Sequence, residues 1–156
     1  MAHMLQNPEV KSLEQIFDRR TQYHIPLFQR DYAWTDDEVN DLFSDLLRLH
    51  ADGEEHFFGT IVVSPSAPGA MVPAHENIKF VIDGQQRLTS SILLIAAIRH
   101  HLYELTDLQG QIHRKVGDLD DYLFIGRDDD IPNQKPRVSA NRVNQVFLRA
   151  VLTQHA

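Results

Sequence analysis

The stretch from position 78 to position 98 constrains the fold of this chain more than any other part of it. It begins with five residues that favour a β-strand, Ile-Lys-Phe-Val-Ile at 78–82, and runs into Asp83-Gly84. The apolar run that follows at 92–98 is rich in leucine and alanine and does not alternate with period two. The sequence therefore predicts a strand, a tight turn and a buried helix, and not the hairpin that an Asp-Gly pair often marks.

The turn at 83–87 carries residues that are suited to binding phosphate. A strand that leads through a tight turn into a helix directs free backbone N–H groups and the positive end of the helix dipole to one point. Arg87 adds a fork of donors that matches phosphate oxygens, and Gln85 and Gln86 can orient a water, a ribose or a base edge. The alternative is an ordinary turn, with Arg87 paired to a surface carboxylate.

Composition narrows the class of protein. A chain of 156 residues is expected to form one domain with a real core. The absence of cysteine excludes a disulfide framework and a thiolate zinc site, and it fits a cytoplasmic location. No apolar run approaches the roughly 20 residues that span a bilayer, so we expect no membrane association.

The net charge of −7 argues against a protein that coats DNA through a basic surface. It leaves open a local basic patch. The arginines available for such a patch are Arg19, Arg20, Arg30, Arg87, Arg137 and Arg142.

Two capping-box sequences mark helix starts in the first third of the chain. Residues 12–15 have this form and predict a small helix over 12–20. Residues 35–38 have it again and predict an amphipathic helix that ends near His50.

Short strands are predicted at 23–25 and at 56–63. Gly59 lies within the second of them and indicates either a bulge or the close approach of another backbone or a ligand. The proline-rich segment 64–77 is predicted to be a surface loop.

The last third of the chain is predicted to be less regular. Residues 117–136 are acidic and are predicted to form mainly turns. Within them we expect one strand at 122–125 and a solvated acidic loop at 128–130. Residues 139–152 predict an amphipathic helix. The nine histidines show no metal-ligand spacing, so a metal held wholly by protein ligands is not expected.

The segment 25–34 combines Phe28, Tyr32 and Trp34 with the polar run Gln29-Arg30-Asp31. Aromatic rings interleaved with arginine can stack on a base, and they can equally pack into the core. Simple packing does not explain why Arg30 and Asp31, a charged pair, lie inside an aromatic segment, and this favours a functional role for the segment.

Three segments in this order resemble one family. They are Ile-Pro-Leu-Phe-Gln-Arg-Asp-Tyr-Ala-Trp at 25–34, Phe-Gly-Thr-Ile at 58–61, and Asp-Gly-Gln-Gln-Arg-Leu-Thr at 83–89. Together they resemble the N-terminal domain of GmrSD-type, modification-dependent restriction systems, over about residues 12–105. The resemblance implies an α+β fold like that of ParB and sulfiredoxin, a small mixed sheet flanked by helices with a helical C-terminal portion. It implies a ParB-like nucleotide-binding core over 5–107. The segment beyond 107 does not share the resemblance, and because an amphipathic helix runs to the end of the sequence we expect 108–156 to be the start of a further, truncated helical region.

The resemblance also implies an activity. Such a domain binds and hydrolyses a nucleoside triphosphate (GTP, UTP or another) together with Mg²⁺, and senses modified double-stranded DNA. It regulates a separate C-terminal nuclease domain that this sequence does not contain, so we expect triphosphatase activity and no nuclease activity. The alternatives are a non-hydrolysing module that recognises modified DNA and a scaffold whose pocket has lost activity.

The resemblance assigns roles residue by residue. The residues that it implies for catalysis are Asp83, Gln85, Gln86 and Arg87. Those that it implies for nucleotide binding are Gly84, Gln85, Arg87, Gln29 and Arg30. The candidates for contact with DNA are Arg30, Tyr32 and Trp34.

Overall fold

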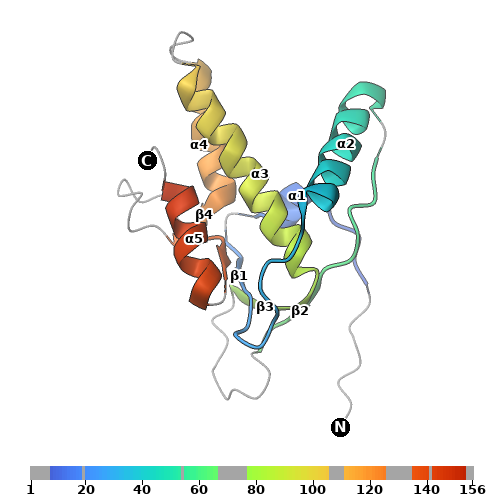
Figure 1. Ribbon diagram of the computed structural model, residues 1–156, viewed down its shortest axis with the longest axis vertical. Helices are drawn as coiled ribbons and strands as arrows, with labels where there is room; N and C mark the ends of the chain where they lie inside the picture. Colours follow the sequence, from blue (N-terminus) through green and yellow to red (C-terminus); the bar gives the residue numbers. More distant parts are fainter. Residues whose placement is uncertain are drawn as a thin grey trace.

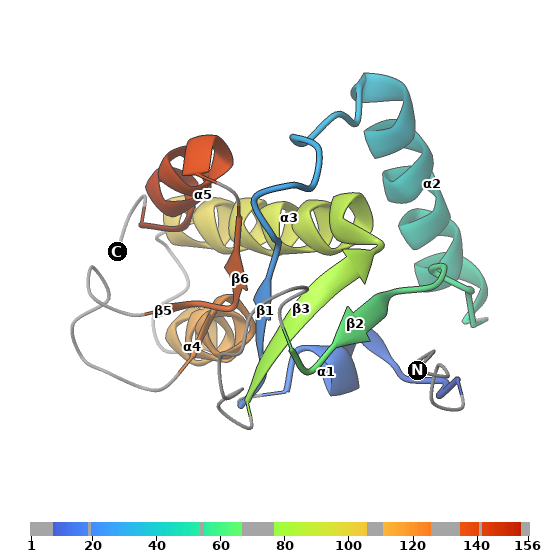
Figure 2. The same ribbon diagram turned by 90° about the horizontal axis from the view of Figure 1, so that it is seen from below.

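The computed structural model describes residues 8–18, 20–53, 55–66, 77–105, 111–125, 135–140 and 142–153. Its helices are α1 (Leu13–Ile16), α2 (Asp36–Asp52), α3 (Gln85–Glu104), α4 (Gln111–Leu123) and α5 (Arg142–Thr153). Its strands are β1 (Gln22–His24), β2 (Val62–Ser64), β3 (Ile78–Asp83), β4 (Phe124–Ile125), β5 (Lys135–Pro136) and β6 (Val138–Ser139). The predicted α+β class, a small mixed sheet with helices around it and a helical end, is confirmed (Figures 1 and 2).

The main sheet has the strand order β2-β3-β1-β6. β1 is parallel to both of its neighbours, β3 and β6, whereas β2 is antiparallel to β3. β4 and β5 form a separate antiparallel pair. Residues after position 107, where we expected a further region to begin, therefore supply an edge strand to the same sheet as residues from the start of the chain.

The predicted strand, turn and helix at 78–98 are confirmed. β3 ends at Asp83, Gly84 adopts φ 86°, and α3 starts at Gln85. α3 extends to Glu104, six residues beyond the end of the apolar run at position 98. Its Leu88 and Ile92 are fully buried in the core. The other members of that core are Phe17, Tyr23, Ile25, Val81, Ala96, Leu123, Phe124, Val138, Leu148 and Leu152.

Both predicted capping boxes are present. The backbone N–H of Ser12 donates to Gln15 Oε1 at 2.9 Å, and that of Thr35 donates to Glu38 Oε2 at 2.7 Å. The first helix is shorter than predicted, since α1 ends at Ile16. α2 stands apart from the other helices, as Figure 1 shows.

Two predictions of secondary structure are wrong. The predicted strand over 56–63 is reduced to β2, because Gly59 has φ 107° and turns the chain out of the extended conformation. The region from 117 onward begins with the helix α4 and not with turns, and only 124–125 remains of the predicted strand. The apolar spacing 112, 116, 119 and 123 is helical, but Gly117 and the surrounding carboxylates obscured it.

Among the side chains that the structure describes, two arginines are buried. Arg99 of α3 is 2% exposed, and its Nε lies 2.6 Å from Oδ1 of Asp120 on α4. Burial is the main cause that raises the pKa of the Asp120 carboxyl, and Arg99 opposes it. Arg137 has no exposed surface, so it is not available for the local basic patch that the sequence left open.

Some sequence features lie outside the described residues. They are Arg19, most of the loop at 64–77 and the acidic run at 128–130. Within the described ranges, no helix combines the length and the apolar character that crossing a membrane requires.

Candidate functional site

The segment 29–33, which we name the strap, crosses the start of α3 and is held there by the two glutamines of the turn. Gln86 uses both ends of its amide, because its Nε2 donates to Asp31 O at 3.0 Å and its Oε1 accepts from Ala33 N–H at 2.9 Å. This is a complete pair of hydrogen bonds to the backbone. In this structure Gln86 therefore serves to fasten the strap.

Further contacts fix the two ends of the strap. Gln85 Nε2 donates to the carbonyl of Arg30 at 2.9 Å, and Gln29 Nε2 donates to the carbonyl of Ile82 at 2.9 Å. The hydroxyl groups of Tyr32 and Ser90 are hydrogen-bonded at 2.8 Å. The segments 25–34 and 83–89, which are remote in sequence, thus form one hydrogen-bonded unit.

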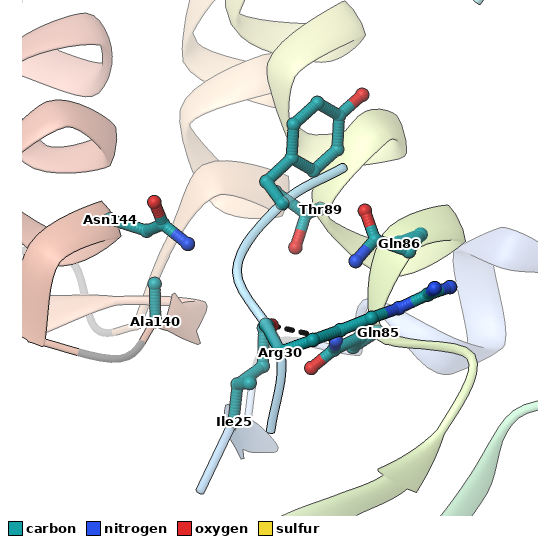
Figure 3. A pocket seen from close by; sticks show the side chains of 8 residues that line it. Ile25, Arg30, Gln85, Gln86, Thr89, Ala140 and Asn144 are labelled. Carbon is teal, nitrogen blue, oxygen red and sulfur yellow. Dashed lines mark hydrogen bonds between the residues drawn. The ribbon is translucent and has the colours of Figure 1, made fainter. Parts of the chain in front are cut away.

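Gln85 differs from Gln86 in having an unused acceptor. Its side chain is buried, and Oε1 has no hydrogen-bond partner among the described residues. A cavity of about 20 Å³ lies beside it. The residues that line this cavity are Ile25, Arg30, Tyr32, Gln85, Gln86, Thr89, Ala140 and Asn144 (Figure 3). A cavity of this size is large enough for one water molecule.

The start of α3 leaves backbone donors unsatisfied. Gly84 supplies no side-chain cap, and within the described part of the chain no acceptor receives the N–H groups of Gln85, Gln86 or Arg87. The first N–H groups of a helix need a partner from a side chain, water or a ligand. They also carry the positive end of the helix dipole, so an anion is a suitable partner.

Arg87 lies against the backbone of residues 59–60. A Cβ atom at Gly59 would be 2.7 Å from its Nε and 2.9 Å from its Cζ, and its Nη1 is 3.5 Å from the carbonyl oxygen of Thr60. The group that approaches Gly59 closely is therefore an arginine side chain, and not the backbone or ligand that the sequence suggested. Arg87 remains partly exposed, and the described residues offer it no carboxylate partner.

Gly84 is packed against the same segment, and this gives a test of the turn. A Cβ at Gly84 would lie 2.8 Å from the Thr60 carbonyl oxygen, whereas one at Gly53, which also has positive φ, would meet nothing within 4 Å. An alanine at either position bears the left-handed backbone cost of about 1–2 kcal/mol. At Gly84 the backbone of 60–61 must also shift, which adds about 1–3 kcal/mol.

We therefore expect Gly84→Ala to lower the free energy of unfolding by more than Gly53→Ala does, in urea titrations followed by circular dichroism. Gly53→Ala is the matched control, because it carries the same backbone strain without the contact. Equal losses for the two variants would show that the contact between the turn and residues 60–61 contributes nothing.

The remaining predicted site residues are placed as follows. Asp83 is exposed at the end of β3, and Arg30 is exposed on the strap. Trp34 is half-buried and lines a second, larger hollow together with Arg87. Among the described residues, no group of three or more histidine, aspartate or glutamate side chains could hold a metal ion.

Sequence reasoning missed the contribution of the C-terminal helix. Asn144 of α5 lines the small cavity, and its Nδ2 is 3.4 Å from Oδ1 of Asp31 on the strap. The two residues are 113 positions apart, and no local pattern indicates the contact. Residues 60 and 61, in contrast, belong to the segment 58–61, which is one of the three segments that resemble the family.

The sequence matches one family, described as GmrSD restriction endonuclease, N-terminal domain, over residues 13–154. The match extends well past position 105, in agreement with the shared sheet and core. None of the curated proteins that were compared matches the chain. The chain belongs to the family of N-terminal domains of GmrSD restriction endonucleases.

Proposed function

We propose that this domain binds and hydrolyses a nucleoside triphosphate, and that it does so as the regulatory part of a restriction endonuclease. The observation that carries the proposal is the uncapped start of α3. Three backbone N–H groups without acceptors occur there in the same turn of helix as Arg87, whose guanidinium has no acidic partner in the described part of the chain. The oxygens of a polyphosphate would accept hydrogen bonds from these N–H groups and from the Arg87 guanidinium.

Arg87 is proposed to hold the phosphate oxygens. Among the described residues, the only hydrogen bond of its guanidinium is to the carbonyl oxygen of Thr60, at 3.5 Å, so a phosphate can replace this weak interaction at little cost. Arg30 is exposed on the neighbouring strap and can add a second positive charge. Gln29 and Gly84 would act indirectly, the first by anchoring the strap to Ile82 and the second by forming the turn.

Mg²⁺ is proposed to enter with the nucleotide. The described residues contain no cluster of ligands for it, and Asp83, exposed at the end of β3, is the carboxylate of the turn itself. Magnesium sites of this kind use one or two carboxylates, with phosphate oxygens and water as the other ligands. The ion would neutralise charge on the triphosphate when bound.

Gln85 is proposed to position the attacking water. Gln86 has both ends of its amide hydrogen-bonded to the strap, whereas Gln85 lines a cavity of about 20 Å³ and its Oε1 has no hydrogen-bond partner in the described part of the chain. An amide oxygen can orient a water by accepting one of its protons, as in other phosphoryl transfers. Catalysis would then consist of positioning and charge stabilisation.

The test is the release of inorganic phosphate from GTP and UTP in the presence of Mg²⁺. We expect Gln85→Ala to lower kcat at least about tenfold, which is about 1.4 kcal/mol of barrier, with a smaller change in nucleotide affinity. Gln86→Ala is the comparison, and should chiefly lower stability. A wild-type protein that binds triphosphate but releases no phosphate would reject the hydrolytic part of the proposal.

One observation favours the alternative of a module that recognises modified DNA without hydrolysis. Phe28 is 66% exposed and lies two residues before the exposed Arg30, an arrangement suited to stacking and to contact with a phosphate backbone. Titration with modified and unmodified duplexes at two salt concentrations tests it. A contact to the modification should resist salt better than a contact to phosphate does.

A further inference from the structure

A hollow of about 230 Å³ lies between α2 and the start of α3. The residues that line it are Trp34, Glu38, Asp41, Leu42, Asp45, His56, Phe58 and Arg87. Only Arg87 belongs to the turn at 83–87, and the opposite wall comes from α2. The hollow therefore adjoins the proposed phosphate site without being part of it.

The two sides of the hollow carry charges of opposite sign. Arg87 contributes a positive charge, and α2 contributes carboxylates. Two of these carboxylates already have partners, since Glu38 accepts from Thr35 N–H and Asp45 Oδ2 lies 3.3 Å from His56 Nε2. The hydrogen bonds from Thr35 also lower the pKa of Glu38. Asp41 has no hydrogen bond or ion pair with any described residue, so its acceptors are available to a ligand.

Apolar and aromatic side chains form the rest of the wall. Trp34 and Phe58 are half-buried, and Leu42 lies beside them. A ligand that fits must present a flat apolar face to the rings, hydrogen-bond donors to Asp41 and a negative group toward Arg87. The hollow is smaller than the roughly 300–1,000 Å³ of a complete small-molecule site, so it suits one part of such a ligand.

We infer that this hollow is the nucleoside subsite: the base stacks on Trp34, and Asp41 accepts hydrogen bonds from the N–H groups of the base or the hydroxyl groups of the ribose. The inference rests on the proposed function, because the triphosphate must leave the hollow past Arg87. The carboxylates fix the orientation, since they repel the phosphate chain and attract the donors of the nucleoside. A metal ion is a poor alternative, because no described group of side chains could hold one there.

The chain provides its own probe for this subsite, because Trp34 is its single tryptophan. Its fluorescence should be quenched when a base stacks on the indole ring. Titrations with GTP, UTP and inorganic tripolyphosphate, all with Mg²⁺, separate the nucleoside from the phosphate. We expect both nucleotides to quench the emission, and we expect tripolyphosphate to bind in calorimetry without quenching it.

The role of Asp41 is tested by Asp41→Asn. The substitution should weaken binding of the nucleotides about tenfold, because the acceptor loses its charge and one of its two oxygens becomes an NH2 donor, and should leave tripolyphosphate binding unchanged or slightly stronger. Asp52→Asn is the matched control, since Asp52 is an exposed carboxylate on the same helix outside the hollow. It should alter neither affinity.

The two proposals can fail separately. The subsite is rejected, and the phosphate site stands, if the nucleotides bind with the same affinity as tripolyphosphate. In that case the nucleotides would neither quench the Trp34 emission nor bind more weakly to the Asp41→Asn variant. If neither tripolyphosphate nor the nucleotides bind, the proposed function fails. A titration with guanosine, which has no phosphate, then tests the subsite by itself. Absence of quenching by millimolar guanosine would overturn it, whereas quenching that Asp41→Asn weakens would support it.

Discussion

Replacement of Arg137 by methionine should lower the free energy of unfolding by more than about 3 kcal/mol, since each buried acceptor left without a donor costs about 1–3 kcal/mol. Arg137 is fully buried. Its guanidinium donates to five backbone carbonyl groups, those of Asp18, Thr21, Asp121, Tyr122 and Phe124. These carbonyls come from the entry to β1, from the end of α4 and from the start of β4, so one side chain joins segments about 100 residues apart.

Urea unfolding followed by circular dichroism measures the effect. Arg48→Met is the control, because the Arg48 side chain is 75% exposed and its ion pair with Asp45 is 3.8 Å long. That variant should stay within about 0.5 kcal/mol of the wild type. A loss for Arg137→Met as small as this would mean that the five carbonyls find other donors and that Arg137 does not hold these segments together.

Replacement of Arg87 by alanine should weaken the binding of tripolyphosphate and of nucleoside triphosphates about 100-fold. A bidentate, charge-assisted pair between guanidinium and phosphate contributes about 3 kcal/mol, which corresponds to that factor. Stability should change little, because the side chain is partly exposed and its contact to Thr60 is long. Arg87→Lys should recover only part of the affinity, since an ammonium group keeps the charge and loses the fork.

Isothermal titration calorimetry at one fixed salt concentration measures these affinities. Arg48→Ala again serves as the control, because it removes an equal charge from an exposed residue of α2 that lines neither cavity. If Arg87→Ala and Arg48→Ala weakened binding equally, the interaction would be a general response to net charge and not a site at Arg87.

The part of the fold that the sequence predicted best depends on local signals. The strand, turn and helix around Gly84 followed from a change of hydrophobic pattern at one glycine. Both helix starts followed from capping boxes, in which the partners are three residues apart. Such features are set by neighbours in the chain, so no knowledge of the tertiary structure is needed to find them.

The features that the sequence did not predict depend on distant partners. Arg137 looks like a surface residue until the carbonyls around it are known, because a buried charge is tolerated only where the fold supplies acceptors. Gln86 was interpreted as a residue for water or ligand, and its hydrogen bonds to the strap come from residues more than 50 positions earlier. The sequence pointed to the turn, but only the structure distinguishes Gln86, whose amide is hydrogen-bonded at both ends to the strap, from Gln85, whose Oε1 has no partner among the described residues.

The most direct test of the account is a crystal structure of this domain with Mg²⁺ and a non-hydrolysable GTP analogue. We expect phosphate oxygens at about 3 Å from the Arg87 guanidinium and from backbone N–H groups of the first turn of α3, with the base against Trp34. Phosphates bound elsewhere, with Arg87 still resting on the Thr60 carbonyl and the first turn of α3 unoccupied, would contradict it.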